Sequence, residues 1–143
     1  MTVDGPKGKS TIVRMKVVAD TSAFLAVAMN EPEKPWLIAT TGGKDLVAPA
    51  VFPYEAANAL SGLWKRKAVS DRDVLAAWDV IAKIPVELAG IDVRAALALA
   101  VKLGCYAYDA FFLQCAMEAR CPLLTLDRQM RRLARGLNIP VLE

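Results

Sequence analysis

Short apolar runs alternate with longer amphipathic segments along almost the whole chain, and this alternation limits the folds open to it. A run of four or five apolar or β-branched residues is typical of a buried strand, whereas apolar residues spaced three or four apart are typical of a helix. Strands separated by helices predict strand–helix–strand units with parallel strands. We therefore expect one α/β domain, with a mostly parallel central sheet and helices on both faces.

The expected elements follow one another with short turns between them. Strands are predicted at Lys16–Asp20, Asp45–Pro49, Val86–Ile91, Pro122–Leu126 and Ile139–Leu142. Helices are predicted at Thr21–Asn30, at Lys34–Thr41, from Pro53 through YEAANALSGLWKRK, over DVLAAWDVIAKI, at Val93–Leu103, at Tyr108–Arg120 and at Arg128–Arg135. Ser70 and Asp73 form a capping-box-like start for the fourth helix, and Gly104 and Gly136 are expected to close the helices before them.

Length and composition fit a single globular domain, because 143 residues can bury one core but not two ordinary ones. The apolar stretches are all interrupted well before 18 residues, so no membrane span is expected. The first 14 residues, MTVDGPKGKSTIVR, lack the apolar core of a secretory signal. We expect them to be a flexible extension to a domain over residues 15–143, with Met15 as an alternative start. The three cysteines form no CxxC pair, which favours a reduced, cytoplasmic setting.

The chain contains no histidine, and this absence narrows the possible chemistry most. It excludes Ser-His-Asp and Cys-His nucleophile systems and nearly every zinc site. It also excludes RNA cleavage by a pair of histidines. An enzyme of this composition must rely on carboxylates, hydroxyls, Lys and Arg side chains, or a metal ion.

Four acidic residues are expected near the carboxyl edge of the sheet, where ligands bind in open α/β folds. Asp20 ends the run VVAD and Asp127 ends LLTLD, in what looks like the corresponding place. Glu55 falls in the first turn of the third helix, and Asp109 opens the helix before the fourth strand. For any one of them, capping a helix or complementing its dipole is the commoner role. Asp109 differs because it lies on the apolar face of its helix, where a carboxylate is costly unless it is paired or binds a metal.

Four carboxylates at one sheet edge repel one another, and a divalent cation would neutralise them. Oxygen ligands without His or Cys select hard ions, Mg²⁺ or Mn²⁺, which also bind substrate phosphates. Such an ion lowers the pKa of a bound water, orients it for in-line attack and stabilises charge on the leaving oxygen. The predicted reaction is hydrolysis of a phosphodiester bond.

Four motifs, VVADTSAFLA, PYEAANAL, YDAFFLQCA and LLTLDRQM, occur in this order and spacing. Through them the chain, from about Lys16 to Leu142, resembles the PIN-domain ribonucleases, and most closely the VapC-type toxins of bacterial and archaeal toxin–antitoxin pairs. The resemblance implies a catalytic and metal-binding quartet around Mg²⁺ or Mn²⁺, formed by Asp20, Glu55, Asp109 and Asp127.

Several polar residues also match the family pattern. Thr21 and Ser22 match the hydroxyls that follow its first acid, and Thr125 matches one near its last. We expect these hydroxyls to orient carboxylates or a water of the metal, with helix-start hydrogen bonding as the alternative. Asn58 matches an E-x-x-N spacing and is expected to steady the carboxylate of Glu55.

A positive strip follows the last acid. Residues 120–135 contain five arginines and one acid, a net charge of +4, and four of the arginines share one face of the last helix: Arg128, Arg131, Arg132 and Arg135. Arginine forks suit phosphate oxygens, so this face is predicted to bind an RNA backbone. A solvated helix face and a surface for an acidic partner are the alternatives.

The prediction is therefore a Mg²⁺- or Mn²⁺-dependent endoribonuclease that acts as a toxin and leaves a 5′-phosphate and a 3′-hydroxyl. The resemblance further implies a homodimer and a cognate antitoxin that crosses the active-site groove. The alternatives are a housekeeping PIN-type RNA-processing nuclease without an antitoxin, and an inactive PIN fold used as a binding scaffold. A phosphoacceptor signalling module is disfavoured, because it requires an acidic pair after the first strand and only Asp20 is present there.

Overall fold

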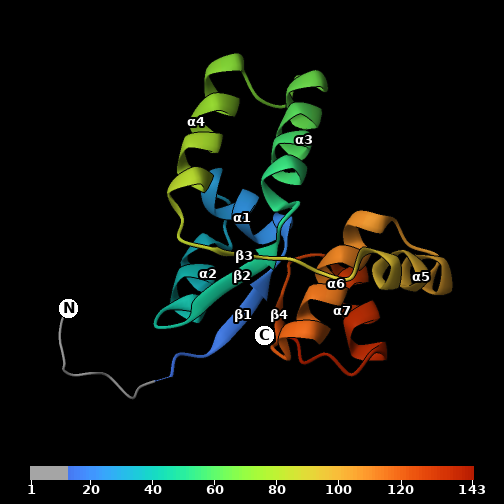
Figure 1. Ribbon diagram of the computed structural model, residues 1–143. Coiled ribbons are helices and arrows are strands. Elements are labelled where there is room, and N and C mark those ends of the chain that lie inside the picture. Colours follow the sequence, from blue (N-terminus) through green and yellow to red (C-terminus); the bar gives the residue numbers. More distant parts are fainter. Residues whose placement is uncertain (1–12) are drawn as a thin grey trace.

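The computed structural model describes residues 13–143 (Figure 1). Strands and helices alternate along them in the order β1 (Lys16–Ala19), α1 (Thr21–Ala28), α2 (Lys34–Thr41), β2 (Asp45–Pro49), α3 (Phe52–Lys65), α4 (Asp71–Lys83), β3 (Glu87–Ala89), α5 (Val93–Leu103), α6 (Ala107–Ala119), β4 (Leu123–Leu124) and α7 (Arg128–Gly136). The flexible extension predicted for residues 1–14 lies outside the described residues except for its last two. Of these, Arg14 forms an ion pair with Asp45, with Nε 2.8 Å from Oδ1.

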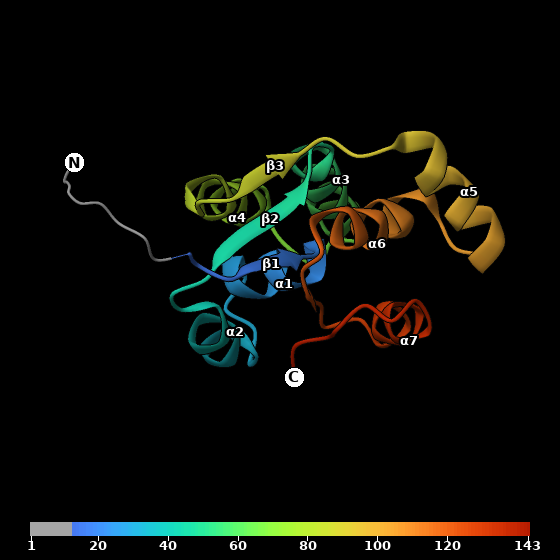
Figure 2. The same cartoon turned by 60° about the horizontal axis from the view of Figure 1, so that its bottom comes forward.

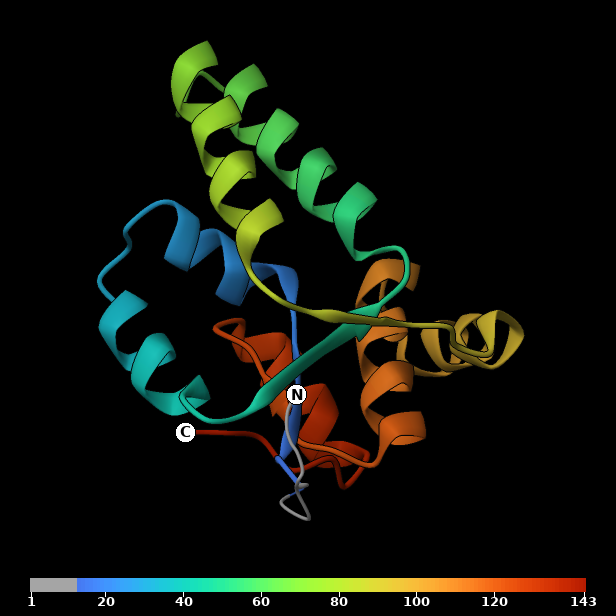
Figure 3. The same ribbon diagram turned by 60° about the vertical axis from the view of Figure 1, so that its left-hand side comes forward.

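The four strands form one parallel sheet in the order β3-β2-β1-β4. Figure 2 shows β1, β2 and β3 side by side. After β3 the chain continues through α5 and α6 to β4, which pairs with the other edge of β1. Helices α1 and α2 lie on one side of the strands and α5 and α6 on the other (Figure 3). This confirms the predicted α/β domain with a mostly parallel sheet and helices on both faces.

The core is built on the middle strands. Val17 and Val18 of β1 are completely buried, and Val47 of β2 is almost so. Each such side chain contributes roughly 1.5–3 kcal/mol of hydrophobic stabilisation. Two aromatic rings, Phe24 of α1 and Phe52 of α3, meet with centroids 4.3 Å apart and join the helices that follow the first two strands.

Side-chain caps set several helix starts, as the sequence predicts. Ser70 accepts a hydrogen bond from the backbone N–H of Asp73 at the start of α4, and Asp20 and Asp127 cap α1 and α7. Gly104 ends α5 in the left-handed conformation, with φ at +69°, which favours glycine.

The C-terminal part departs from the prediction. The strand expected at Pro122–Leu126 is reduced to Leu123–Leu124, and the strand expected at Ile139–Leu142 is a single bridge between Val141 and Leu123. Gly136 is the last residue of α7 rather than its cap, and Asn138 takes the left-handed conformation instead. Beyond Leu124 the backbone bonds to side chains rather than to a neighbouring strand. The Thr125 carbonyl accepts a hydrogen bond from Arg131 Nε at 3.1 Å, and the Leu126 N–H donates one to Ser22 Oγ at 3.0 Å.

Helices α3 and α4 form a hairpin that stands out from the sheet (Figure 1). Within residues 13–143, no single helix is both long and apolar enough to cross a membrane. Helices α5 and α6 reach that length and composition together, but the chain bends by 117° between them.

Candidate active site at the carboxyl edge

The four predicted acids all lie at the N-terminal ends of helices. Asp20 caps α1 directly after β1, and Asp127 caps α7 after β4. Glu55 and Asp109 lie in the first turns of α3 and α6. Because β1, β2 and β4 are parallel, their carboxyl ends meet at one edge, and the helix dipoles there favour negative charge.

Asp20 is the buried member of the group, with only 6% of its surface exposed. Its Oδ1 accepts hydrogen bonds from Ser22 Oγ at 2.6 Å and from the Ala23 N–H at 3.3 Å, and its Oδ2 accepts one from Thr125 Oγ1 at 2.5 Å. Burial raises the pKa of Asp20 to about 6, against the lowering effect of these hydrogen bonds, and the charge of Asp127 adds to the rise. A buried carboxylate without a cationic partner within residues 13–143 is favourable for binding a cation.

Asp127 does not occupy the place that corresponds to Asp20, contrary to the sequence prediction. Ala19 pairs with Leu124, so Thr125 follows β4 where Asp20 follows β1. Thr125 is completely buried, and Asp127 lies two residues further on, exposed, with Oδ1 capping α7. Two buried carboxylates on neighbouring parallel strands would repel each other strongly, and the threonine supplies a hydrogen-bond donor instead.

The other two acids are about half-buried. Glu55 accepts a hydrogen bond from the Thr21 hydroxyl; burial raises the pKa of Glu55, the charge of Asp109 adds to the rise, and the Thr21 bond opposes it. Burial and then the charge of Asp127 raise the pKa of Asp109. Repulsion therefore links the acids in sequence, from Asp20 to Asp127, from Asp127 to Asp109, and from Asp109 to Glu55.

The charge of Asp127 raises the pKa values of Asp20 and Asp109, and the charge of Asp109 raises the pKa of Glu55, yet the four acids do not form a preformed metal site. Among residues 13–143, no three acidic, Cys or His side chains are grouped so that they could hold a metal ion as they stand. Asp127 is engaged in its cap and Glu55 with Thr21. The donor set nevertheless fits Mg²⁺ or Mn²⁺, because it consists of carboxylate oxygens whose mutual repulsion a hard cation relieves. The shared metal site remains a prediction.

Side-chain hydroxyls link the turn after β1, which carries Asp20, to the turn after β4, which carries Asp127. Ser22 Oγ accepts a hydrogen bond from the Leu126 N–H at 3.0 Å while donating to Asp20, and Thr125 Oγ1 accepts one from the Asp127 N–H at 3.0 Å. The hydroxyls thus orient a carboxylate and bond near helix starts at once, so the two alternatives coexist.

Asn58 does not make the contact expected of it. Its side chain is exposed and has no hydrogen bond to Glu55 among the described residues, and Thr21 bonds to that carboxylate instead. Asn58 lies one turn further along α3 than Glu55 and is exposed, whereas Glu55 is partly buried.

The four arginines of α7 differ from one another. Arg131 is partly buried, and its Nε donates to the Thr125 carbonyl at 3.1 Å, so its side chain is fixed beside the acids. Arg135 forms an ion pair with Glu143, with 3.0 Å between Nη2 and Oε1. Arg128 and Arg132 are exposed and have no ion pair within residues 13–143.

Sequence reasoning overlooked the tyrosines at this edge. Tyr54 directly precedes Glu55, Tyr108 directly precedes Asp109, and Tyr106 is the N-cap residue of α6. All three are exposed. Their position beside the acids in the sequence was the available signal.

The parallel sheet and the acids at its carboxyl edge define the class of protein. The chain belongs to the PIN domain family, whose model matches residues 17–136, and the predicted resemblance to PIN domains is thereby confirmed. PIN domains are generally nucleases.

Two solved structures share the fold. The chain is similar to PAE2754 from Pyrobaculum aerophilum, with a TM-score of 0.63 and 25% identity, over 87% of this chain and 90% of that one. It is also similar to VapBC2 from Rickettsia felis bound to a DNA fragment from their promoter, with a TM-score of 0.62 and 12% identity, over 90% of this chain and 98% of that one. No match was found among curated proteins.

Proposed function

We propose that the protein is an endoribonuclease that requires Mg²⁺ or Mn²⁺ and acts as the toxin of a type II toxin–antitoxin pair. Its PIN-domain family supports nuclease activity. Its fold is shared with VapBC2 from Rickettsia felis, which supports the pairing with an antitoxin.

The burial of Asp20 is the observation that supports the proposal most strongly. Asp20 is buried at the end of β1 and held by two hydroxyls, and the charge of Asp127 adds to the rise of its pKa, without a protein cation to neutralise it among the described residues. A fold keeps such a group at a cost of several kcal/mol unless something else binds there. A hard divalent cation is the ligand that this arrangement suits.

Each residue at this edge of the sheet would then have its own role. Asp20, Glu55, Asp109 and Asp127 would hold the cation, which when bound lowers the pKa of a water and neutralises charge on the phosphate. Ser22 and Thr125 fix the orientation of Asp20, and Thr21 does the same for Glu55.

Of the four acids, Asp109 has the carboxylate most available to the cation. Its carboxylate has no hydrogen bond within residues 13–143, and its pKa is raised. The water oxygen would attack phosphorus and release a proton to solvent, the bond to the 3′ oxygen would break, and that oxygen would take up a proton from solvent. The products are a 5′-phosphate and a 3′-hydroxyl.

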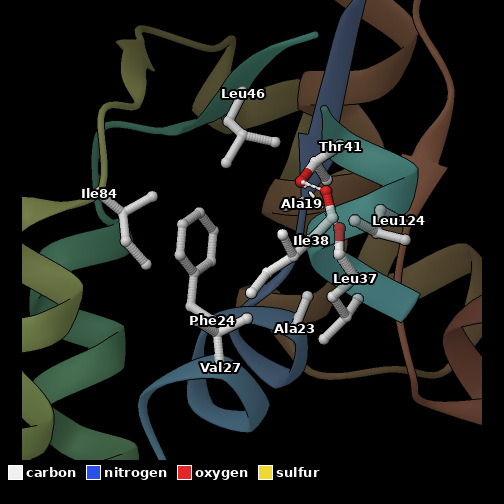
Figure 4. Close-up of a pocket in the computed structure, with 10 residues that line it drawn as sticks. All are labelled: Ala19, Ala23, Phe24, Val27, Leu37, Ile38, Thr41, Leu46, Ile84 and Leu124. Carbon is white, nitrogen blue, oxygen red and sulfur yellow. Dashed lines mark hydrogen bonds between the residues drawn. The ribbon is translucent and has the colours of Figure 1, made fainter. Parts of the chain in front are cut away.

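The antitoxin would find an apolar pocket next to this site. A cavity of about 170 Å³ opens between α1, α2, β2 and the residue that follows α4. Figure 4 shows the Phe24 ring between Ile84 and Ile38, and Ala19 and Leu124, which directly precede Asp20 and Thr125, also line the cavity. The Thr41 hydroxyl among these residues is satisfied by the Leu37 carbonyl at 2.8 Å. An apolar side chain of an antitoxin would fit there. The homodimer remains a prediction.

Cleavage of end-labelled RNA by the purified protein tests the nuclease proposal. We expect cutting with Mg²⁺ or Mn²⁺, none with EDTA, and a loss of at least about a hundredfold in Asp20→Asn and Asp109→Asn. Asp79→Asn is the matched control, because Asp79 is an exposed acid on α4, and it should cut normally. Calorimetry should detect Mn²⁺ binding to the wild type and not to Asp20→Asn. Normal cutting by Asp20→Asn would refute the mechanism.

Induced expression tests the toxin role. Wild type should arrest growth, Asp20→Asn should not, and co-expression of a small protein encoded directly upstream should relieve the arrest. Cleavage without growth arrest would favour the housekeeping nuclease instead.

A further inference from the structure

The phenylalanine and tyrosine rings of the chain lie in different environments. Phe24, Phe52 and Phe112 are 2–3% exposed, and Phe111 is only partly exposed. The three tyrosines of the chain are all exposed, Tyr54 by 74%, Tyr106 by 85% and Tyr108 by 41%. A tyrosine ring buries well, so leaving all three in solvent needs a reason other than the core.

All three tyrosines flank the same pair of acids. Tyr54 lies in the first turn of α3 beside Glu55, and Tyr106 and Tyr108 lie at the start of α6 beside Asp109. Both helix starts lie at the carboxyl edge of the sheet, because α3 follows β2 and α6 packs against β1 and β2. Figures 1 and 3 both place the N-terminal end of α6 close to that of α3.

The side chains of the three tyrosines make few contacts that would stabilise the fold. No hydroxyl of the three takes part in a hydrogen bond among residues 13–143, and Tyr106 does not cap α6 with its side chain. Tyr108 meets Phe111 edge to face, with centroids 5.9 Å apart and planes at 87°. That contact fixes one ring in position at the rim of the site.

Their chemistry suits a particular part of the substrate. An arginine beside Glu55 or Asp109 would bind phosphate, but it would also pair with the carboxylate and compete with a metal ion. A tyrosine ring carries no charge, so it leaves the acids available, and its face can stack on a base of any sequence. Bases in a duplex are already stacked on one another, so only unpaired bases can use such a surface.

We propose that Tyr54, Tyr106 and Tyr108 form a stacking rim that holds unpaired nucleobases of single-stranded RNA next to the acids, while α7 contacts phosphates. This inference rests on the proposed nuclease function and deepens it, because it names the side chains that would hold the bases of the substrate. The tyrosines are positioning residues.

The test measures binding rather than cutting. Short single-stranded RNA containing 2-aminopurine, whose fluorescence is quenched by stacking, is titrated with the full chain carrying Asp20→Asn in the presence of Ca²⁺. We expect quenching on binding, an affinity loss of about tenfold for added Tyr106→Ala or Tyr54→Ala, and near-normal binding and quenching for the matching Phe variants. Leu75→Ala, an exposed apolar residue of α4, should bind normally. Duplex RNA of the same sequence should bind weakly and equally to all variants.

Three outcomes would overturn the stacking rim. These are Ala variants that bind and quench normally, Phe variants as weak as Ala variants, and Ala variants that lose only dimer or protein-partner binding. If the wild type cuts RNA and the tyrosine variants change neither affinity nor quenching, the rim is wrong and the nuclease proposal stands. If neither the wild type nor Asp20→Asn binds single-stranded RNA, both are wrong.

Discussion

The two turns that carry Asp20 and Asp127 look alike in the sequence and differ in the structure. The first puts a carboxylate directly after its strand, buried, and the second puts Thr125 there and keeps Asp127 exposed two residues later. The two turns are not copies but complements, since the threonine of one donates to the aspartate of the other. Without a cation, the carboxyl edge of the sheet accommodates one buried negative charge.

Making the turns alike should have the largest effect. Thr125→Asp places a second buried carboxylate beside Asp20 and removes its donor, so we expect the free energy of unfolding to fall by about 3–5 kcal/mol at pH 7 without divalent ions. Urea denaturation measures this. Thr125→Val, which removes the hydroxyl without adding charge, should lose about 1.5–3 kcal/mol. Equal losses in both variants would show that charge repulsion is not the reason for the threonine.

The sequence predicted the general arrangement well because patterning governs it. Apolar periodicity and the caps at Ser70 and Gly104 placed most helices and two full strands correctly. Prediction from the sequence failed where a residue bonds to another that lies far away in the chain. Thr125, which follows β4, bonds to Asp20 across 105 positions, and the Leu126 N–H bonds to Ser22 across 104. Asn58 is exposed although its spacing places it one helical turn from Glu55. The tyrosines were missed because exposure is a tertiary property.

Titration of the buried carboxylate should have the next largest effect. Folding raises the pKa of Asp20 from 3.8 to about 6, so between these values the folded state binds more protons than the unfolded state. Without divalent ions, this contribution is fully present below about pH 3.8 and is lost as the pH rises through about 6. We expect it to be worth about 3 kcal/mol. Glu55 and Asp109 act in the same direction.

Urea denaturation at pH 4, 5, 6 and 7 with EDTA checks this dependence. Asp20→Asn should be more stable than the wild type at pH 7, and the advantage should shrink toward pH 4. The exposed Asp79 on α4 provides the control, since Asp79→Asn should follow the wild type at every pH. A wild type that gains stability relative to Asp20→Asn from pH 4 to 7 would contradict the buried, uncompensated carboxylate.

Substitutions of Asp127, in the exposed turn, should have the smallest effect on stability. They separate the role of Asp127 as a helix cap from the role of its charge. Asp127 Oδ1 accepts hydrogen bonds from the N–H groups of Gln129 and Met130, and asparagine can cap in the same way. Asp127→Ala should therefore cost about 1 kcal/mol of unfolding free energy, and Asp127→Asn much less. Both should lose RNA cleavage, because neither retains the charge that a metal ion needs. If Asp127→Asn kept both stability and cleavage, Asp127 would be only a helix cap, and the site would have to work with the three remaining acids.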